Sequence, residues 1–116
     1  MESMAAVVPD AAVGSKATPL QRAFIRELLL GQSPDGYAAL CNVIAKSTVG
    51  DLSAVKARVL IVAGSEDKSA NIEGCKRYND ELGDLAELKV MEGVGHWHAI
   101  EAVDEISTIV DEFVGV

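Results

Sequence analysis

The stretch RVLIVAG at residues 58–64 decides the fold that the sequence predicts. It is a continuous run of apolar residues, with a charged residue at its start and a glycine at its end. A strand with one exposed face alternates apolar and polar side chains, whereas a continuous run is typical of a strand covered on both faces, usually in a parallel sheet. We therefore expect a buried strand around Val59–Val62 and an α/β fold.

The segments that follow predict a βαβα order. Asn71 can cap a helix that runs to about residue 82, and Gly83 can end it. Residues 87–91 alternate in polarity, as in a second, less buried strand, and a last helix is expected at residues 99–114. Two strands joined by a helix should be parallel, with a right-handed crossover. The apolar face of the last helix is predicted to comprise Ile100, Val103, Ile106, Val110 and Phe113.

Residues 1–50 predict a small helical layer, and residues 51–116 the βαβα unit. Thr18, Pro19 and Gln21 have the pattern of a capping box with proline at the first helical position, and Ser33 with Pro34 starts another helix. Helical spacing predicts a buried stripe on each of these helices. The first stripe comprises Leu20, Phe24, Ile25, Leu28 and Leu29, and the second comprises Tyr37, Leu40, Cys41, Ile44 and Ala45.

Composition excludes several classes of protein. Hydrophobic residues make up 49% of the 116 residues, enough for a packed core, so the chain is not a disordered tail. Ten Lys and Arg against 18 Asp and Glu give a formal charge of −8. This balance argues against nucleic acid and against an anionic membrane surface as partners, because both favour basic residues. No apolar run approaches the roughly 20 residues of a membrane span.

The N-terminus and the cysteines predict a cytoplasmic protein. Glu2 stands where a secretory signal would carry basic residues, so neither a signal peptide nor a transit peptide is expected. Cys41 and Cys75 are far apart in the sequence and form no C-x-x-C pattern, so neither a disulfide framework nor a zinc site is expected. Each is interpreted as a small buried apolar residue rather than a catalytic thiol.

Two loops with polar residues follow the two predicted strands. Residues 64–68 read GSEDK and residues 93–98 read GVGHWH. Sites in open parallel sheets form at the carboxyl ends of the strands, so Asp67 and His96 can meet there. A carboxylate that accepts a hydrogen bond from an imidazole orients the base of a nucleophilic triad. An Asp in such a turn is most often a turn or cap residue, so only the two loops together suggest catalysis.

The segment from Asp51 to Phe113 resembles the C-terminal part of an α/β-hydrolase. It has a strand followed by G-x-x-D, a helix, a strand followed by G-x-G-H, and then a Glu and a closing helix. The resemblance implies that Asp67 is the triad acid, that His96 is the general base, and that Glu101 is the acidic residue that often opens the last helix. Residues 1–50 resemble the helical cap that precedes this part of the family's chain.

The two loops are most similar to those of the 3-oxoadipate enol-lactonase and esterase-like branch. The resemblance implies a small ester or lactone substrate, no cofactor, and a substrate pocket that includes Trp97 and His98. Asn71 stands where the family usually has Pro. The family's G-x-S-x-G nucleophile motif does not occur, and Ser33 is interpreted as a helix cap. The nucleophile, the oxyanion hole and most of the sheet are therefore expected before residue 1.

Two alternatives concern metals and assembly. His96, His98 and Glu101 could suggest a metal site, but the two histidines lie in a loop and there is no third, so no metal is predicted. Two parallel strands also do not make a stable sheet by themselves. The chain could therefore be a shortened, non-catalytic product that folds only by self-association, as a homodimer through the exposed edge of the Val59–Val62 strand, or by binding a partner chain there.

Overall fold

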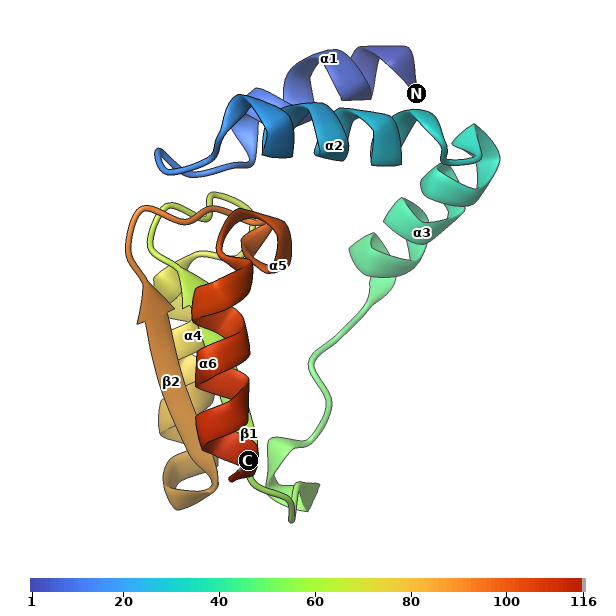
Figure 1. The fold of residues 1–116 in the computed structure, drawn as a ribbon. Helices are drawn as coiled ribbons and strands as arrows, with labels where there is room; N and C mark the ends of the chain where they lie inside the picture. The colour runs from blue at the N-terminus through green and yellow to red at the C-terminus, as the bar shows by residue number, and fades with distance from the viewer. Residues whose placement is uncertain (116) are drawn as a thin grey trace.

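A computed structural model describes residues 1–115 as a helical layer followed by a βαβα unit. The helical layer contains α1 (Glu2–Ala11), α2 (Pro19–Leu30) and α3 (Pro34–Lys46). In Figure 1, α1 and α2 lie across one end of the βαβα unit, and a long connection runs from α3 to the other end. A short 3₁₀ turn, Leu52–Ala54, interrupts this connection. None of the helices within residues 1–115 is long and apolar enough to cross a membrane.

The βαβα unit contains a two-stranded parallel sheet, which confirms the predicted mixed α/β class. Strand β1 (Val59–Gly64) pairs with β2 (Ala86–Met91) in a register that runs from Val59 beside Ala86 to Gly64 beside Met91. Helix α4 (Ile72–Leu82) joins the strands, and it packs on the sheet from the side opposite α6 (Val103–Val114), as Figure 1 shows. The carboxyl ends of both strands therefore point toward α1 and α2.

The strand β1 is less covered than its sequence predicts. Residues 59–62 are half-buried, and only Ala63 and Gly64 at the carboxyl end are buried. Helices α4 and α6 cover the two faces of β1, as predicted, but the expected full burial of Val59–Val62 is not reached. The physical reason is the width of the sheet, because in the described residues each strand has a single neighbour and one open edge.

The predicted start of α2 is confirmed. The hydroxyl oxygen of Thr18 accepts a hydrogen bond from the backbone N–H of Gln21 at 3.3 Å, and the Gln21 side-chain oxygen accepts one from the N–H of Thr18 at 2.8 Å. The Gln21 side-chain amide also donates to the backbone carbonyl oxygens of Ile100 and Glu101 at 2.8 and 3.0 Å. Gln21 thus both completes the capping box of α2 and attaches this helix to the βαβα unit.

The buried stripe of α2 is narrower than predicted. Ile25 and Leu29 are buried and form a small core with Ala5 and Val13. The other three predicted members are exposed: Leu20 by 79%, Phe24 by 53% and Leu28 by 38%. Helix α1 is the principal packing partner of α2 and covers only one side of it, which explains the difference.

The prediction of a buried stripe on α3 is wrong. No residue of α3 is buried, and Leu40, Val43 and Ile44 are all more than half exposed. Only Tyr37 packs against the small core, because α3 extends away from α2 and has no extensive packing partner among the described elements. Cys41 lies on α3 and is therefore exposed. Cys75 lies on α4 and is half-buried, so the expectation that both thiols are buried is also wrong.

The last predicted helix is two helices. It breaks at Ala102, whose backbone is not helical, into α5 (His98–Glu101) and α6. Ile100 packs against the core of the helical layer, and Val103 and Val110 are exposed, so the predicted single apolar face is wrong. The break lets the Glu101 side chain turn back toward the loops at the strand ends, where it is buried.

Candidate active site

The two loops at the carboxyl ends of β1 and β2 lie against each other. The N–H of Ser65 donates to the carbonyl oxygen of Met91 at 2.9 Å, and the N–H of Glu66 donates to that of Val94 at 2.9 Å. A Cβ added at Gly64 would collide with the carbonyl oxygens of Val94 and Gly95, so this contact requires glycine. The close approach brings the acid-bearing and histidine-bearing loops together.

Asp67 and His96 form a hydrogen-bonded pair at this junction. The distance from Asp67 Oδ2 to His96 Nδ1 is 2.9 Å, and the other Asp67 oxygen accepts from the N–H groups of Ser69 and Ala70 at 2.7 and 2.9 Å. The Asp67 side chain is only 4% exposed. Burial alone would raise the pKa of the Asp67 carboxyl, but the hydrogen bonds from Ala70, His96 and Ser69 outweigh it and hold that pKa below its usual value.

This pairing determines which nitrogen of the His96 ring carries the proton and which one carries the free lone pair. An ionised Asp67 can only accept hydrogen bonds, so Nδ1 of His96 carries the proton and the lone pair is on Nε2. The His96 ring packs edge-on against Trp97, with 6.4 Å between the ring centroids, and its side chain is 46% exposed. General-base catalysis by a histidine requires one ring nitrogen to be held by a carboxylate while the ring stays accessible to a reactant, and the His96 ring meets both conditions.

Glu101 fixes the backbone on both sides of His96. Its carboxylate accepts hydrogen bonds from the N–H groups of Gly95 at 2.9 Å, Trp97 at 3.0 Å and Gly14 at 2.7 Å. The residue as a whole is 8% exposed, so its charge lies in a buried place. A buried carboxylate is stable only when such donors surround it. The family resemblance implies an acidic residue at this position, and in the structure its carboxylate binds the backbone N–H groups of Gly14 and of the histidine-bearing loop.

A segment that the sequence analysis did not single out completes the site. Residues 12–16, here called the strap, connect α1 toward α2 and run along the histidine-bearing loop. The N–H of His96 donates to the carbonyl oxygen of Ala12 at 2.8 Å, and the N–H of Lys16 donates to that of Gly93 at 3.1 Å. A Cβ at Gly14 would collide with the Gly93 carbonyl oxygen. The glycine at position 14 is therefore the feature of the sequence that could have suggested a close approach of two backbones here.

An open cavity of about 630 Å³ lies beside the Asp67–His96 pair. Most of its lining is apolar and comes from α1, the strap, α2 and α3, and its polar edge comes from the two loops. The lining residues are Met4, Val8, Ala11, Ala12, Leu29, Tyr37, Lys68, Ser69, His96 and Trp97. Trp97 lines this cavity and His98 does not. His98 begins α5, and its Nδ1 is buried without a hydrogen-bond partner among the described residues.

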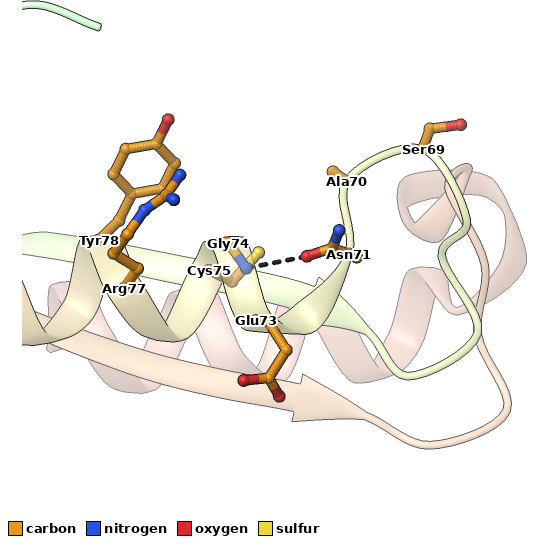
Figure 2. Close-up of a pocket in the computed structure, with 8 residues that line it drawn as sticks. All are labelled: Ser69, Ala70, Asn71, Glu73, Gly74, Cys75, Arg77 and Tyr78. Atoms are coloured by element: carbon orange, nitrogen blue, oxygen red, sulfur yellow. Dashed lines mark hydrogen bonds between the residues drawn. The ribbon is translucent and has the colours of Figure 1, made fainter.

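A second hollow, of about 520 Å³, lies along the first two turns of α4 (Figure 2). It is lined by residues from Ser69 to Tyr78, among them the charged Glu73 and Arg77, and neither Asp67 nor His96 lines it. Its polar contact is the Asn71 side-chain oxygen, which accepts from the N–H of Gly74 at 2.9 Å, the dashed line in Figure 2. This bond is the predicted helix cap, so the hydrogen bond in the second hollow belongs to the start of α4.

Within residues 1–115, no serine hydroxyl is hydrogen-bonded to the His96 ring, and no three metal-binding side chains lie close enough together to hold an ion. A scan against protein families finds no match for the chain, and searches of curated proteins and of solved structures find none either. The described residues therefore bring a hydrogen-bonded Asp–His pair to the edge of a mostly apolar cavity.

Proposed function

We propose that this chain is the C-terminal part of an α/β-hydrolase and supplies the acid and base of a Ser-Asp-His triad that hydrolyses a small ester or lactone. The observation that carries the proposal is the 2.9 Å pair between Asp67 and His96 at the carboxyl ends of two parallel strands. The resemblance of the two loops to that family supports it. The nucleophilic serine would come from protein sequence outside these 116 residues.

In the proposed reaction, Nε2 of His96 takes the proton of the serine hydroxyl as its oxygen attacks the substrate carbonyl. The imidazolium, stabilised by ionised Asp67, then gives the proton to the leaving alkoxide, and the acyl-serine forms. Water then attacks the acyl carbon while His96 removes one of its protons. The bond from that carbon to the serine oxygen breaks, the carboxylic acid is released, and His96 returns the proton to the serine oxygen. No cofactor takes part in these steps.

The cavity favours a substrate with a small apolar portion. Met4, Val8, Leu29 and Trp97 present apolar surface beside His96, while Lys68 and Ser69 lie at the polar edge. Apolar lining with few polar groups is typical of small-molecule sites. Helices α1 to α3 would accordingly act as the cap of the hydrolase.

Cys41 and Cys75 are both free thiols, which supports the cytoplasmic location in the same proposal.

The test is to join the chain to the upstream half of an α/β-hydrolase that carries G-x-S-x-G and to measure hydrolysis of p-nitrophenyl acetate. His96→Ala and Asp67→Asn should each lower kcat by on the order of 10³–10⁴-fold, because the base or its orientation is lost. Asp80→Asn removes the same charge from an exposed site on α4 and is the matched control. Unchanged activity in His96→Ala or in Asp67→Asn would contradict the assigned roles.

A second candidate function is a shortened, non-catalytic chain that folds only by assembling with itself or by binding another protein. The open edges of β1 and β2 and the exposed apolar side chains of α2 and α3 favour it. Sedimentation of the purified chain distinguishes the two. A dimer that dissociates when a charge is placed on the β1 edge would support assembly, and a well-folded monomer would contradict it.

A further inference from the structure

We propose that Ser15 and Glu66 are positioning residues that hold the strap against the acid-bearing loop and thereby keep His96 paired with Asp67. The inference deepens the proposed function, since it rests on the role given there to the Asp67–His96 pair. Neither residue lines the cavity beside His96, so they would act through the backbone rather than on a substrate.

The contact between them is bidentate. One carboxylate oxygen of Glu66 accepts from the backbone N–H of Ser15 at 2.7 Å, and the other accepts from the Ser15 hydroxyl at 2.6 Å. Hydrogen bonds to an ionised acceptor are shorter and stronger than neutral ones. The pKa of the Glu66 carboxyl is held below its usual value by these two bonds, with a smaller contribution from the charges of Lys68 and Lys16.

The contact closes a ring of hydrogen bonds around the pair. Glu66 directly precedes Asp67, and Asp67 binds the His96 ring. The N–H of His96 binds Ala12 at the start of the strap, and Ser15 near its end returns to Glu66. The acid-bearing loop and the backbone of His96 are therefore attached to the same five-residue segment.

Removing this contact should leave the strap attached to His96 but not to the acid-bearing loop. The two ends of the Asp67–His96 hydrogen bond would then be carried by segments that move more independently. Ser15 and Glu66 are separated by 51 positions in the sequence, so the contact constrains parts of the chain that local structure does not. A looser pair would no longer select the tautomer of His96 that leaves Nε2 free.

The experiment observes His96 by NMR in the 15N-labelled 116-residue chain, at a pH where the ring is neutral. The ring nitrogen shifts report the fractions of the two tautomers, and hydrogen exchange reports the His96 backbone N–H. In the wild type we expect mainly the Nδ1–H tautomer. In Ser15→Ala and Glu66→Ala the Nε2–H tautomer should become detectable. The His96 amide should exchange about tenfold faster, because the strap that accepts its hydrogen bond is no longer tied to the acid-bearing loop and opens more often.

Controls separate positioning from a general effect on the fold. Ser15→Thr keeps the hydroxyl and should retain the wild-type tautomer. Glu73→Ala removes an exposed acid on α4 that pairs with Lys76, and Ser107→Ala removes an exposed hydroxyl on α6; neither should change the His96 signals. The amides of β1 should exchange as in the wild type throughout.

Three results would overturn the proposal. They are an unchanged tautomer fraction in both Ser15→Ala and Glu66→Ala, an equal change in the control variants, and faster exchange that spreads equally to the amides of β1 or unfolds the chain. The measurement does not use hydrolysis, so it fails or succeeds separately from the proposed function. A tautomer change in these variants together with an inactive hydrolase fusion would contradict only the proposed function.

Discussion

The end of the sheet that carries Asp67 and His96 differs sharply from α3 and the connection after it. At the sheet end, Met91 and Val94 are fully buried, and Glu101 is buried among three backbone donors. Helix α3 also carries apolar side chains, among them Leu40, Val43 and Ile44, yet none of its residues is buried. The difference teaches that burial in this chain follows the long-range hydrogen bonds around Asp67 and His96, and that apolar content alone does not produce it.

The same comparison shows what an amphipathic pattern means. The stripe on α3 indicates a helix that requires an apolar partner, and it does not show that the partner lies in the same chain. The strap makes the opposite case: its sequence has no periodicity, yet it contacts both site loops. Four predictions test this contrast.

The largest expected effect is the loss of the Glu101 carboxylate. Glu101→Ala would leave the N–H groups of Gly14, Gly95 and Trp97 without their acceptor in a buried place. We expect a decrease of about 3–5 kcal/mol in the free energy of unfolding, measured by urea denaturation. Glu105→Ala, an exposed acid on α6, is the control and should change it by less than about 0.5 kcal/mol. Equal midpoints for the two variants would show that the site end is not specially stabilised.

A smaller effect is expected from adding one methyl group at a glycine. Gly64→Ala places a Cβ against the backbone of Val94 and Gly95, where no flexible side chain can give way. We expect a decrease of about 1–3 kcal/mol in the free energy of unfolding. Gly50→Ala makes the same change in the connection after α3, where nothing lies within 4 Å, and should be neutral or slightly stabilising. A Gly50→Ala variant as damaging as Gly64→Ala would remove the contrast between the regions.

A still smaller effect is expected in how the free energy of unfolding depends on pH. The pKa of the Asp67 carboxyl is below its usual value in the folded chain, so its stabilisation is present above the unfolded pKa of about 4 and is lost as the pH falls through the lower, folded pKa. Unfolding free energies measured from pH 6 downward should therefore decline below about pH 4, and less steeply in Asp67→Asn. Parallel slopes for wild type and Asp67→Asn would contradict the hydrogen bonding assigned to this carboxylate.

The smallest effect is expected on α3. Ile44→Ala removes an apolar side chain that is 64% exposed and should change the free energy of unfolding by less than about 0.5 kcal/mol. The matched substitution Ile25→Ala, at a fully buried position on α2, should cost about 2–5 kcal/mol. If Ile44→Ala costs as much as Ile25→Ala, then α3 is buried in solution, and the assembly candidate gains support.

Local patterns in the sequence determined much of this protein. The capping box at Thr18, the cap at Asn71, and the order of strand and helix follow from short-range rules of spacing and hydrogen bonding. The meeting of Asp67 with His96 was predictable as well, because the carboxyl ends of adjacent parallel strands lie at the same edge of a sheet.

Only the tertiary structure decided which apolar faces have partners and what holds the site loops. Burial of Val59–Val62 or of α3 depends on the number of neighbouring elements, which a periodic pattern does not contain. The contacts of Glu101 with Gly14 and of Glu66 with Ser15 join positions 87 and 51 residues apart. Such contacts arise when the folded backbone brings donors and acceptors together, and no local propensity encodes that approach.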